Sequence, residues 1–514
     1  MILDLSFFSL IGMDFLLVTP EFWILATALI FQFTSLFFPT LERVMSYLLV
    51  ISLLFLAYLM NSYNLNGSGF NQVYYSSDFT NLVKEYILIL TAMVVLVYMG
   101  YQRYYQRYKS ESYEFSSNFL NMKYLEDKPF IRSSYITLML LSVIGMFLII
   151  SSRDFILLYM GVELQTLVLY IMAAFNTEDE RSSEAGLKYF ILSALASGLM
   201  LFGMSYIYGF SGSLDFNVLN NLYSDHNNLL LVASPAVVIG IVMVIVALCF
   251  KISAAPFHMW VQDVYEGSPV ISTIFFASVP KLANMVALIN ILFFAFEAHP
   301  SVWIDIMKFV ALASLIVGSF GAIMQNSVKR LIAYSSIVNI GYICLAFASG
   351  NYTAIYVSVI YFMIYAISII GFFSSIMSVL PDKIENLQLE DLSGMAKVKK
   401  IAAMTIAIFI FSMIGIPPIA GFFGKFYIFK TVIGSGDYMM AIAGVLASVV
   451  SAFYYLRIVK IMYFDLPRIS ASKISVSINL YFVSFVCVIF TLGFMVFANQ
   501  FLGFFNFPAE LIHD

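Results

Sequence analysis

The chain has 514 residues, of which 61% are hydrophobic and 11% are charged, and its net charge at pH 7 is -4. Its mean hydropathy of +0.92 lies far outside the range of soluble globular proteins. The composition therefore predicts a membrane protein, while the small net charge excludes no class of partner. Because the N-terminal run carries Asp4 and Asp14 instead of basic residues, a cleaved secretory signal is not expected.

Apolar segments of about 20 residues, the length of a membrane-spanning helix, follow one another along almost the whole chain. They predict an all-α polytopic membrane protein with about 14 transmembrane helices. The expected helix cores, in chain order, are 16–38, 43–61, 80–101, 133–151, 154–175, 185–210, 229–261, 268–296, 301–324, 330–349, 353–380, 401–432, 437–464 and 476–500.

The distribution of basic residues tests this count, because short loops on the cytoplasmic or matrix side carry an excess of Lys and Arg. If the N-terminus lies on the opposite side, the odd-numbered connections collect the basic residues, and the even-numbered connections hold little beyond Arg153. An error of one helix in the middle of the chain would mix the two sets. The segregation therefore supports the segmentation and predicts that both chain ends lie on the outer side.

The seventh and twelfth segments are too long and too interrupted for a simple span. Pro256 shortly follows Lys251 in the seventh, and Pro417 and Pro418 shortly precede Lys425 in the twelfth. Proline removes a helical hydrogen bond and clashes with the preceding turn, and within a membrane such a break is tolerated only where it is buried in protein or faces water. Both segments are therefore predicted to be broken helices, each with a lysine beside the break.

Broken helices at corresponding places in two halves of a transporter indicate an inverted repeat. The predicted five-helix repeats comprise helices 4 to 8 and 9 to 13, although the halves show no convincing residue-by-residue match. The expected domains are 1–132 (three N-terminal helices and a basic loop), 133–296 (first repeat), 297–465 (second repeat) and 466–514 (a C-terminal helix and tail).

Four ionisable side chains within the predicted spans are singled out as candidates for function: Glu163, Lys251, Lys281 and Lys425. A charge at the bilayer centre costs about 2.5 to 3.5 kcal/mol, so such side chains face a protein interior or a water-filled path. Lys281 lies far from both ends of its span and cannot easily extend to either surface. Lys251 and Lys425 could each end a helix and extend outward, but the adjacent prolines argue against this. The set indicates ion movement through the protein.

Two further side chains leave alternatives open. Lys188 follows Glu184 by four residues, which fits a surface ion pair as well as a functional site. His258, two residues after Pro256, could hydrogen-bond backbone groups freed by the helix break or relay protons near neutral pH.

Metal and cofactor sites are not expected in this chain. Cys249, Cys344 and Cys487 stand apart without C-x-x-C spacing, which argues against disulfides, structural zinc and iron–sulfur clusters. The four histidines include no pair placed on one helix as a transmembrane haem requires. The sequence therefore predicts no redox centre.

Five long motifs in the middle of the chain carry a specific resemblance. They are EAGLKYFILSALASGLMLFGMSYIYGFSGSLDF (184–216), FKISAAPFHMWVQDVYEGSP (250–269), ASVPKLANMVAL (277–288), SVKRLIAYSSIVNIGY (327–342) and GFFGKFYIF (421–429). With them, the chain resembles the antiporter-like subunit N of bacterial respiratory complex I, called subunit 2 in mitochondria, over about residues 130 to 465. The lysine in the last motif, where the middle antiporter-like subunit has a glutamate, favours the subunit nearest the quinone-binding arm.

The resemblance implies a proton-translocating subunit of NADH:ubiquinone oxidoreductase. By position in the family's motifs, Glu163 and Lys251 would gate proton entry. Lys281 would be the central lysine, Lys425 would pass protons outward, and Lys188 matches the lysine of helix 6. NADH, FMN, iron–sulfur clusters and ubiquinone would be held by partner subunits. The implied partners are other membrane-arm subunits, especially the neighbouring antiporter-like subunit and the small subunits on the quinone-arm side, with membrane lipids and no nucleic acid.

Two rival interpretations belong to other classes of protein. A stand-alone or multisubunit cation/proton antiporter would use the same fold and the same lysines without redox partners. A purely structural scaffold would need no buried charges, and the presence of several argues against it. The 51 Phe and 33 Tyr residues suggest an AT-rich genome, and so a mitochondrial inner membrane, with a bacterial cytoplasmic membrane as the alternative.

The loop from Gln102 to Ser133, with its six basic residues, is predicted to face the matrix or cytoplasm. A cysteine introduced by Ser117→Cys should therefore resist an impermeant thiol reagent added from the opposite side. The same cysteine should react after the membrane is permeabilised, which provides the control. Labelling in intact membranes from the opposite side would contradict the helix count or the orientation.

Overall fold

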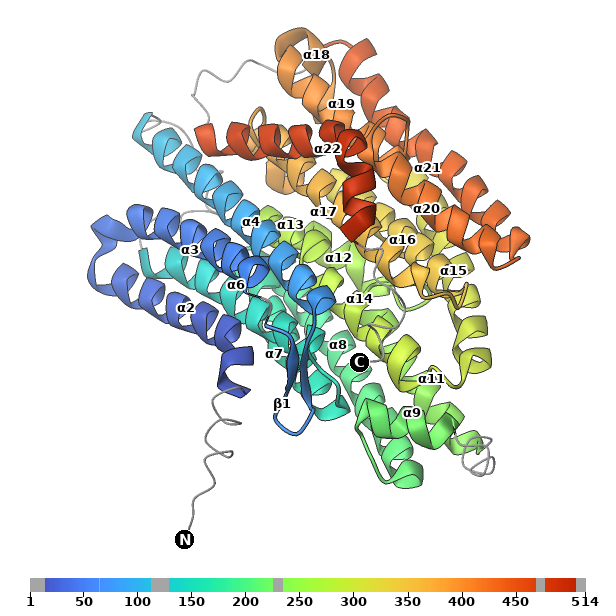
Figure 1. Ribbon diagram of the computed structural model, residues 1–514. Helices are drawn as coiled ribbons and strands as arrows, with labels where there is room; N and C mark the ends of the chain where they lie inside the picture. The colour runs from blue at the N-terminus through green and yellow to red at the C-terminus, as the bar shows by residue number, and fades with distance from the viewer. Residues whose placement is uncertain (1–13, 64, 112–128, 225–233, 468–476, 505–514) are drawn as a thin grey trace. The chain divides into compact units, whose positions relative to one another are not determined.

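The computed structural model describes residues 14–63, 65–111, 129–224, 234–467 and 477–504, and these are mostly helical (Figure 1). The chain divides into two compact units. Unit 1 comprises residues 1–95, 116–251 and 279–300, and unit 2 comprises residues 96–115, 252–278 and 301–514. The chain therefore leaves unit 1 after Lys251 and returns to it at Val279.

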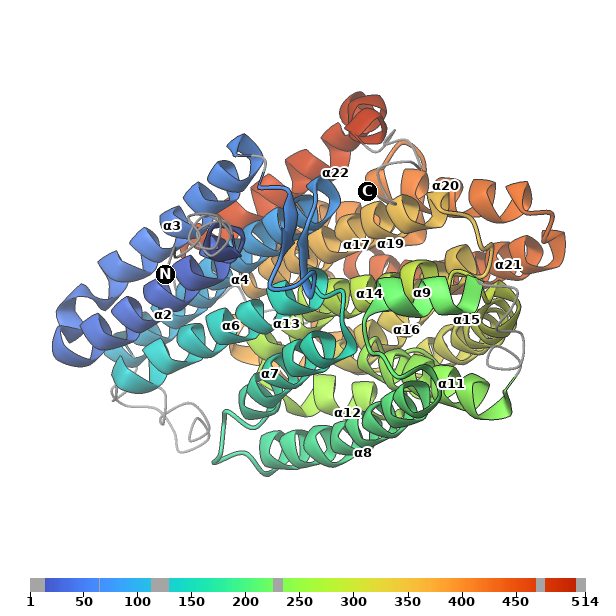
Figure 2. The same cartoon turned by 60° about the horizontal axis from the view of Figure 1, so that its bottom comes forward.

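Unit 1 is built from helices and one small hairpin. The strands β1 and β2 pair antiparallel. Helix α2 packs against α3 and α6, α6 packs against α7, and α8 packs against α11 (Figures 1 and 2). Its elements are α2 (Thr19–Phe37), the 3-10 turn η1 (Pro39–Leu41), α3 (Glu42–Ser62), β1 (Gly67–Gly69), β2 (Tyr74–Ser76), the first part of α4 (Asp78–Glu111), α6 (Pro129–Ile150), α7 (Phe155–Ala173), α8 (Glu180–Ser211), α9 (Phe216–Ser224), α11 (Pro235–Lys251), α14 (Pro280–Asn290) and the π-helical turn η4 (Ile291–Ala295).

Unit 2 is arranged around α17, which is buried along most of its length and packs against α16, α19, α20 and α22. The unit contains the remainder of α4, then α12 (Met259–Gly267), α13 (Val270–Ser278), α15 (Pro300–Ile323), α16 (Val328–Phe347), α17 (Thr353–Met377), the 3-10 turns η5 (Pro381–Asn386) and η6 (Leu389–Leu392), α18 (Met395–Val398), α19 (Lys400–Ile414), α20 (Ala420–Gly434), α21 (Tyr438–Phe464) and α22 (Ile478–Phe504).

The helix content confirms an all-α polytopic membrane protein. In the described ranges, 12 helices are long and apolar enough to cross a membrane, and two shorter apolar helices, α11 and α19, accompany them. Both predicted breaks are present. Helix α11 ends at Lys251 and α12 begins at Met259, while α19 ends at Ile414 and α20 begins at Ala420. The inverted relationship between two repeats, and the four-part domain division, stay predictions.

A third break is present where the sequence predicts a single helix over 268–296. The segment divides at Val279 into α13 and α14, and Pro280 is the first residue of α14. Proline suits the first turn of a helix, because the N–H that it lacks would have no helical partner there. Lys281 therefore lies at the start of a helix, not in the middle of one.

Parts of two predicted regions lie outside the described residues. The predicted basic loop includes residues 112–128, and the predicted C-terminal region includes residues 468–476 and 505–514. The sidedness of the loop stays a prediction that the labelling experiment tests.

A pair of glycines brings α8 and α11 close together. A Cβ atom added to Gly203 of α8 would lie 2.7 Å from the carbonyl oxygen of Gly240, and one added to Gly240 of α11 would lie 2.9 Å from the carbonyl oxygen of Gly203. These distances leave no room for a methyl group, so the small residues allow the two backbones to approach. The same two helices carry Lys251 and the serines that it contacts.

Replacing Gly203 with alanine should push α8 and α11 apart and destabilise the protein by about 1 to 3 kcal/mol, because the added methyl overlaps backbone atoms. The measurement is the temperature at which the assembled protein loses half of its activity. Gly198→Ala is the matched control, since a Cβ atom at Gly198 of the same helix meets nothing within 4 Å. Equal losses in the two variants would show that the contact does not matter.

Candidate functional site

Glu163 of α7 and Lys251 of α11 are joined through a serine of α8. The Nζ atom of Lys251 donates to Ser193 Oγ at 2.7 Å and to Ser197 Oγ at 3.1 Å. The Ser197 hydroxyl in turn donates to Glu163 Oε1. Lys251 is 4% exposed, and Glu163 is partly buried. The structure thus brings together the two residues that the sequence predicts as a pair, with a hydroxyl between them.

The local sequence explains this geometry. Ser193 and Ser197 are four residues apart, so their hydroxyls lie on one face of α8. Lys251 is the last residue of α11, where the backbone carbonyls lack helical partners and the helix dipole favours a cation. A hydroxyl that accepts a hydrogen bond from an ammonium and donates one to a carboxylate can pass a proton between them. The arrangement is therefore suited to proton transfer.

Lys188 lies on the same helix α8, and its Nζ atom pairs with Glu184 Oε1 at 2.7 Å. The two side chains are 41% and 62% exposed, and the spacing is i, i+4. Of the two alternatives that the sequence leaves open, the surface ion pair is present. A role for Lys188 in proton transfer stays a prediction.

Lys281 is buried in the first turn of α14, with 2% of its surface exposed. The carbonyl oxygen of Pro280 accepts two hydrogen bonds, from Gln165 Nε2 of α7 at 3.3 Å and from Asn284 Nδ2 at 3.1 Å. The side-chain oxygens of Gln165 and Asn284 are buried and have no hydrogen-bond partner among the described residues. Buried acceptors of this kind mark a place where a proton donor or a water is needed. Gln165 is two residues from Glu163, so α7 connects both lysine sites of unit 1.

Lys425 of α20 lies beside the break between α19 and α20. Its Nζ atom donates to the carbonyl oxygen of Ile414 at 2.9 Å and to Ser448 Oγ at 3.4 Å. It also lies 4.9 Å from the ring centroid of Tyr342. The carbonyl of Ile414 is freed because α19 ends there, where Gly415 turns the chain with a φ of +89°. The ammonium therefore takes the place of a missing backbone donor.

A line of buried polar side chains lies along α16 in unit 2. Tyr361 Oη donates to Asn339 Oδ1, Asn339 Nδ2 donates to the carbonyl oxygen of Ser335 at 2.8 Å, and Ser335 Oγ is hydrogen-bonded to Tyr455 Oη. Tyr342 meets Tyr361 edge to face, with ring centroids 6.1 Å apart. These residues are not among those predicted from the sequence. The signal is the spacing 335, 339, 342, which places three polar side chains on one face of the helix.

His258 is the residue that precedes α12, and 7% of its surface is exposed. Its Nδ1 atom is buried and has no hydrogen-bond partner among the described residues. One backbone group freed by the break, the N–H of Ala255, donates to Ser314 Oγ at 2.8 Å. Proton relay by His258 stays a prediction.

Two buried lysines are not evident from the sequence. Lys329, which falls in the connection between the predicted spans 301–324 and 330–349, is 2% exposed, and its Nζ atom binds Glu385 Oε2 at 2.9 Å. Lys84 lies inside the third span, which is therefore not free of charge, and it pairs with Glu21. A count of basic residues in loops considers only where a lysine lies along the chain. It cannot predict burial, because the acidic partner that allows each lysine to be buried comes from a distant segment.

Buried lysines beside helix breaks, in a polytopic all-α protein, are typical of membrane proteins that move ions. The family model for the transmembrane region of NADH:quinone oxidoreductases and Mrp antiporters matches residues 152–451. The NADH-quinone oxidoreductase subunit N of Rickettsia conorii is 35% identical over 492 residues, which cover 95% of this chain and 100% of that protein. This chain belongs to the NADH-quinone oxidoreductase subunit N family.

Two solved structures share the fold. A chain of respiratory complex I from Thermus thermophilus, with bound aureothin, has a TM-score of 0.74 and 22% identity, and the match covers 94% of this chain and 98% of that one. A chain of the Mrp complex from Dietzia sp. has a TM-score of 0.77 and 17% identity, covering 95% and 96%. The fold is thus common to a redox-linked complex and to an Mrp complex.

Replacing Ser197 with alanine removes the hydroxyl between Lys251 and Glu163. If this hydroxyl carries protons, translocation should fall by about tenfold or more, since a positioned proton-transfer group contributes at least that much. Assembly should persist, because one buried hydrogen bond contributes only about 1 kcal/mol. The rate is measured as acidification in membrane vesicles. Ser205→Ala, at an exposed position of α8, is the control, and equal rates in both variants would remove Ser197 from the path.

Proposed function

We propose that this chain is a proton-translocating membrane-arm subunit of respiratory complex I. It couples electron transfer from NADH to ubiquinone, carried out by other subunits, to proton movement through buried Glu and Lys side chains. The observation that carries the proposal is the bridge from Lys251 through Ser197 to Glu163. Membership of the subunit N family supports the assignment to complex I, and the relatives' name supports a place within an oxidoreductase complex.

In unit 1, the separation between Glu163 and Lys251 acts as the switch. A carboxylate near a buried lysine favours the charged form of the lysine, and the loss of that neighbour favours release of its proton. Ser197 holds the two groups one hydroxyl apart, so a small movement of α7 relative to α8 changes their interaction. Lys251 takes up a proton when Glu163 is close and gives it up when the carboxylate moves away or becomes protonated.

Lys281 and Lys425 act as further carriers. Each is fully or almost fully buried. Lys281 follows Pro280, whose carbonyl binds the amides of Gln165 and Asn284, and the side-chain oxygens of these two amides are buried without a partner among the described residues. Lys425 donates to the hydroxyl of Ser448. Lysine is suited to this task because its three donors stay available for hydrogen bonds and its charge can be removed.

A cation/proton antiporter without redox partners is the second candidate. The solved structures do not decide between the two candidates, because the Mrp complex chain and the complex I chain each share only the fold with this protein. The 35% identity to subunit N over nearly the whole chain favours complex I. Co-purification decides between them. Iron–sulfur and NADH-binding subunits should accompany this chain, and their absence would favour the antiporter.

The partners follow from this assignment. The neighbouring antiporter-like subunit and the small subunits on the quinone-arm side would contact this chain, and NADH, FMN, iron–sulfur clusters and ubiquinone would lie in partner subunits. Within the described residues, no group of three or more His, Cys, Asp or Glu side chains could hold a metal ion. The Rickettsia conorii relative is bacterial. We retain the mitochondrial inner membrane as the proposed location on the Phe and Tyr content alone.

Lys281→Arg tests whether Lys281 carries protons or only holds a charge. Arginine keeps the positive charge, but its pKa of above about 12 prevents it from releasing a proton during turnover. We expect this variant to assemble and to translocate protons at a strongly reduced rate. The measurement is the number of protons moved per electron in vesicles. Lys281→Met, which removes the charge at similar volume, should also reduce translocation.

A normal ratio of protons to electrons with arginine at position 281 would contradict the proposal. It would show that Lys281 supplies a fixed charge, and the proton path would have to run through other residues.

A further inference from the structure

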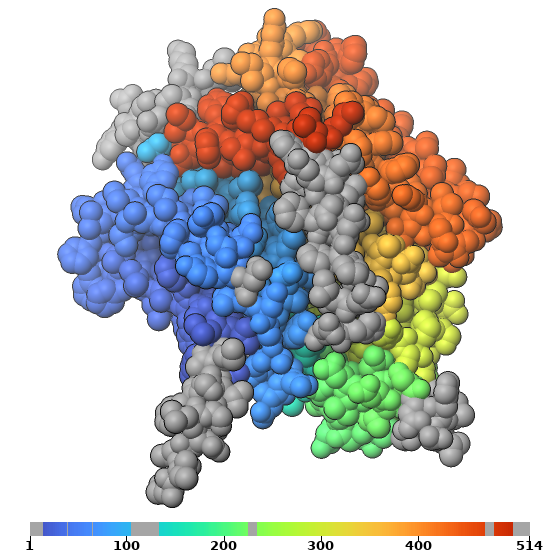
Figure 3. All heavy atoms as spheres, in the orientation of Figure 1, coloured from blue at the N-terminus to red at the C-terminus, as the bar shows by residue number. Residues whose placement is uncertain are grey.

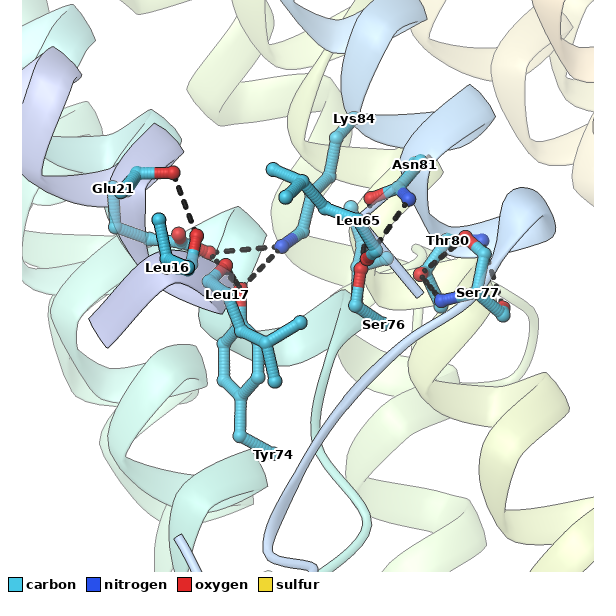
Figure 4. Close-up of polar contacts among 12 residues, drawn as sticks. Leu16, Leu17, Glu21, Leu65, Tyr74, Ser76, Ser77, Thr80, Asn81 and Lys84 are labelled. Atoms are coloured by element: carbon cyan, nitrogen blue, oxygen red, sulfur yellow. Dashed lines mark hydrogen bonds and ion pairs between the residues drawn. The ribbon is translucent and has the colours of Figure 1, made fainter. Parts of the chain in front are cut away.

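A separate polar cluster lies in the N-terminal part of unit 1, before the segment that the family model matches. It joins Lys84 of α4, Glu21 of α2 and Tyr74 of β2 (Figure 4). Lys84 Nζ lies 2.9 Å from Glu21 Oε1 and 2.7 Å from Tyr74 Oη, and Tyr74 Oη lies 2.7 Å from the same carboxylate oxygen. Each of the three side chains is thus within hydrogen-bond distance of the other two.

The cluster is shielded from solvent. The side chains of Lys84 and Glu21 are 1% and 5% exposed, and Tyr74 is 2% exposed. The ammonium also lies 5.1 Å from the ring centroid of Phe147 on α6. The space-filling view shows the surrounding N-terminal helices as a continuous block of side chains (Figure 3). Removing two opposite charges from water costs several kcal/mol for each ion. Apolar side chains of similar volume could therefore hold these helices together at least as well as the ion pair does.

One oxygen of the Glu21 carboxylate takes no part in the hydrogen bonds of the cluster. Glu21 Oε2 is buried and has no hydrogen-bond partner among the described residues, whereas Oε1 accepts from both Lys84 and Tyr74. A buried ionised oxygen without a donor is unfavourable, and it becomes satisfied when it takes up a proton or meets a water. This free acceptor distinguishes the cluster from a closed ion pair in which every polar atom is matched.

Hydrogen bonds connect the cluster to the helices of the main site. The N–H of Tyr75, next to Tyr74, donates to the carbonyl of Ser151 at 2.8 Å, and the N–H of Arg153 donates to the carbonyl of Val73 at 2.9 Å. The next residue, Asp154, caps the N-terminus of α7, the helix of Glu163. The hairpin is therefore fastened to the start of α7.

We propose that Glu21, Lys84 and Tyr74 form an additional proton-transfer site of this protein. Tyr74 Oη accepts a proton from Lys84 Nζ while it gives its own proton to Glu21 Oε1. This transfer leaves a neutral amine, a neutral carboxylic acid and an unchanged tyrosine. The acid then releases a proton through Oε2, and Lys84 takes up another, which restores the starting state.

The position of the cluster suggests the side of the membrane that it serves. Lys84 lies about 9 Å along α4 from the start of that helix, beneath the hairpin between the second and third spans. With the N-terminus on the outer side, this connection also lies on the outer side. The site would therefore exchange protons with the outer compartment. The inference rests on the proposed function, because its protons are those that the protein translocates.

The test separates proton transfer from a purely structural role of the ion pair. Glu21→Gln, Lys84→Met, the double variant and Tyr74→Phe are each made in the intact complex, with assembly followed by native electrophoresis. A structural pair can be replaced as a unit by neutral side chains of similar volume at little cost, whereas removing one partner leaves an unpaired buried charge. We expect proton translocation in all four variants to fall by about tenfold or more, with the double variant no better than the single ones.

Recovery of wild-type translocation in the double variant would overturn the proposal and show a structural pair. Wild-type translocation in the assembled Tyr74→Phe and double variants would overturn it as well, whether or not the single variants assemble. Infrared difference spectra give a second readout, because the carboxyl band of protonated Glu21 should be present during turnover and absent in Glu21→Gln. A spectrum unchanged by that substitution would contradict protonation of Glu21.

Two further variants distinguish a failure of this inference from a failure of the proposed function. Lys383→Met breaks the more exposed ion pair with Asp391 (2.6 Å), and it should leave translocation unchanged. If Lys281→Arg abolishes translocation while the cluster variants are normal, this inference fails and the proposed function stands. If Lys281→Arg is normal, the proposed proton path fails independently of the cluster.

Discussion

A broken helix inside a membrane must have its free backbone groups satisfied by protein, and this requirement organises the candidate site. At the two breaks beside Lys251 and Lys425, a polar side chain meets a freed group. Lys425 donates to the carbonyl of Ile414, and Ser314 accepts from the N–H of Ala255. At the third break, two amides donate to the carbonyl of Pro280 in the first turn of α14. In lipid, an unsatisfied backbone group costs several kcal/mol. The breaks thus require the polar side chains that also make proton transfer possible.

The two units hold their lysines in chemically different ways. Lys251 is linked to an ionisable group, the carboxylate of Glu163, through the hydroxyl of Ser197. Lys425 is bound by dipoles, the Ile414 carbonyl and the Ser448 hydroxyl, and by the face of Tyr342. A carboxylate can change its protonation state or its rotamer, whereas a backbone carbonyl at a helix end is fixed. If the proposed function holds, the group that changes the proton affinity of a lysine lies in unit 1.

Much of the fold follows from the sequence because the membrane imposes a simple rule on length and polarity. Most predicted spans end within a few residues of the observed helices, although α4 continues to Glu111, beyond the predicted end at 101. Pro256 and Pro418 mark the two predicted breaks correctly. The break at Val279 is not predicted, since a proline in the first turn of a helix resembles one inside a continuous span. The lysines of the main site are visible from the sequence as charges in apolar segments.

The partners of these charges are much harder to predict. Ser193 and Ser197 are two among many small polar residues in apolar helices, and only the packing of α8 against α11 shows which of them meet Lys251. The same is true of Glu21, which lies 63 positions from Lys84 along the chain. Sequence periodicity describes the face of one helix. It does not describe which helices touch.

The path of the chain between the units has a consequence for biosynthesis. Unit 1 lacks α14, and with it Lys281, until residues 279–300 have been made, although residues 252–278 belong to unit 2. The ribosome must therefore complete the first segments of the second unit before the first unit is whole. A polypeptide released after Lys251 would contain the serine bridge but not the central lysine. Synthesis of this protein thus cannot finish unit 1 before it starts unit 2.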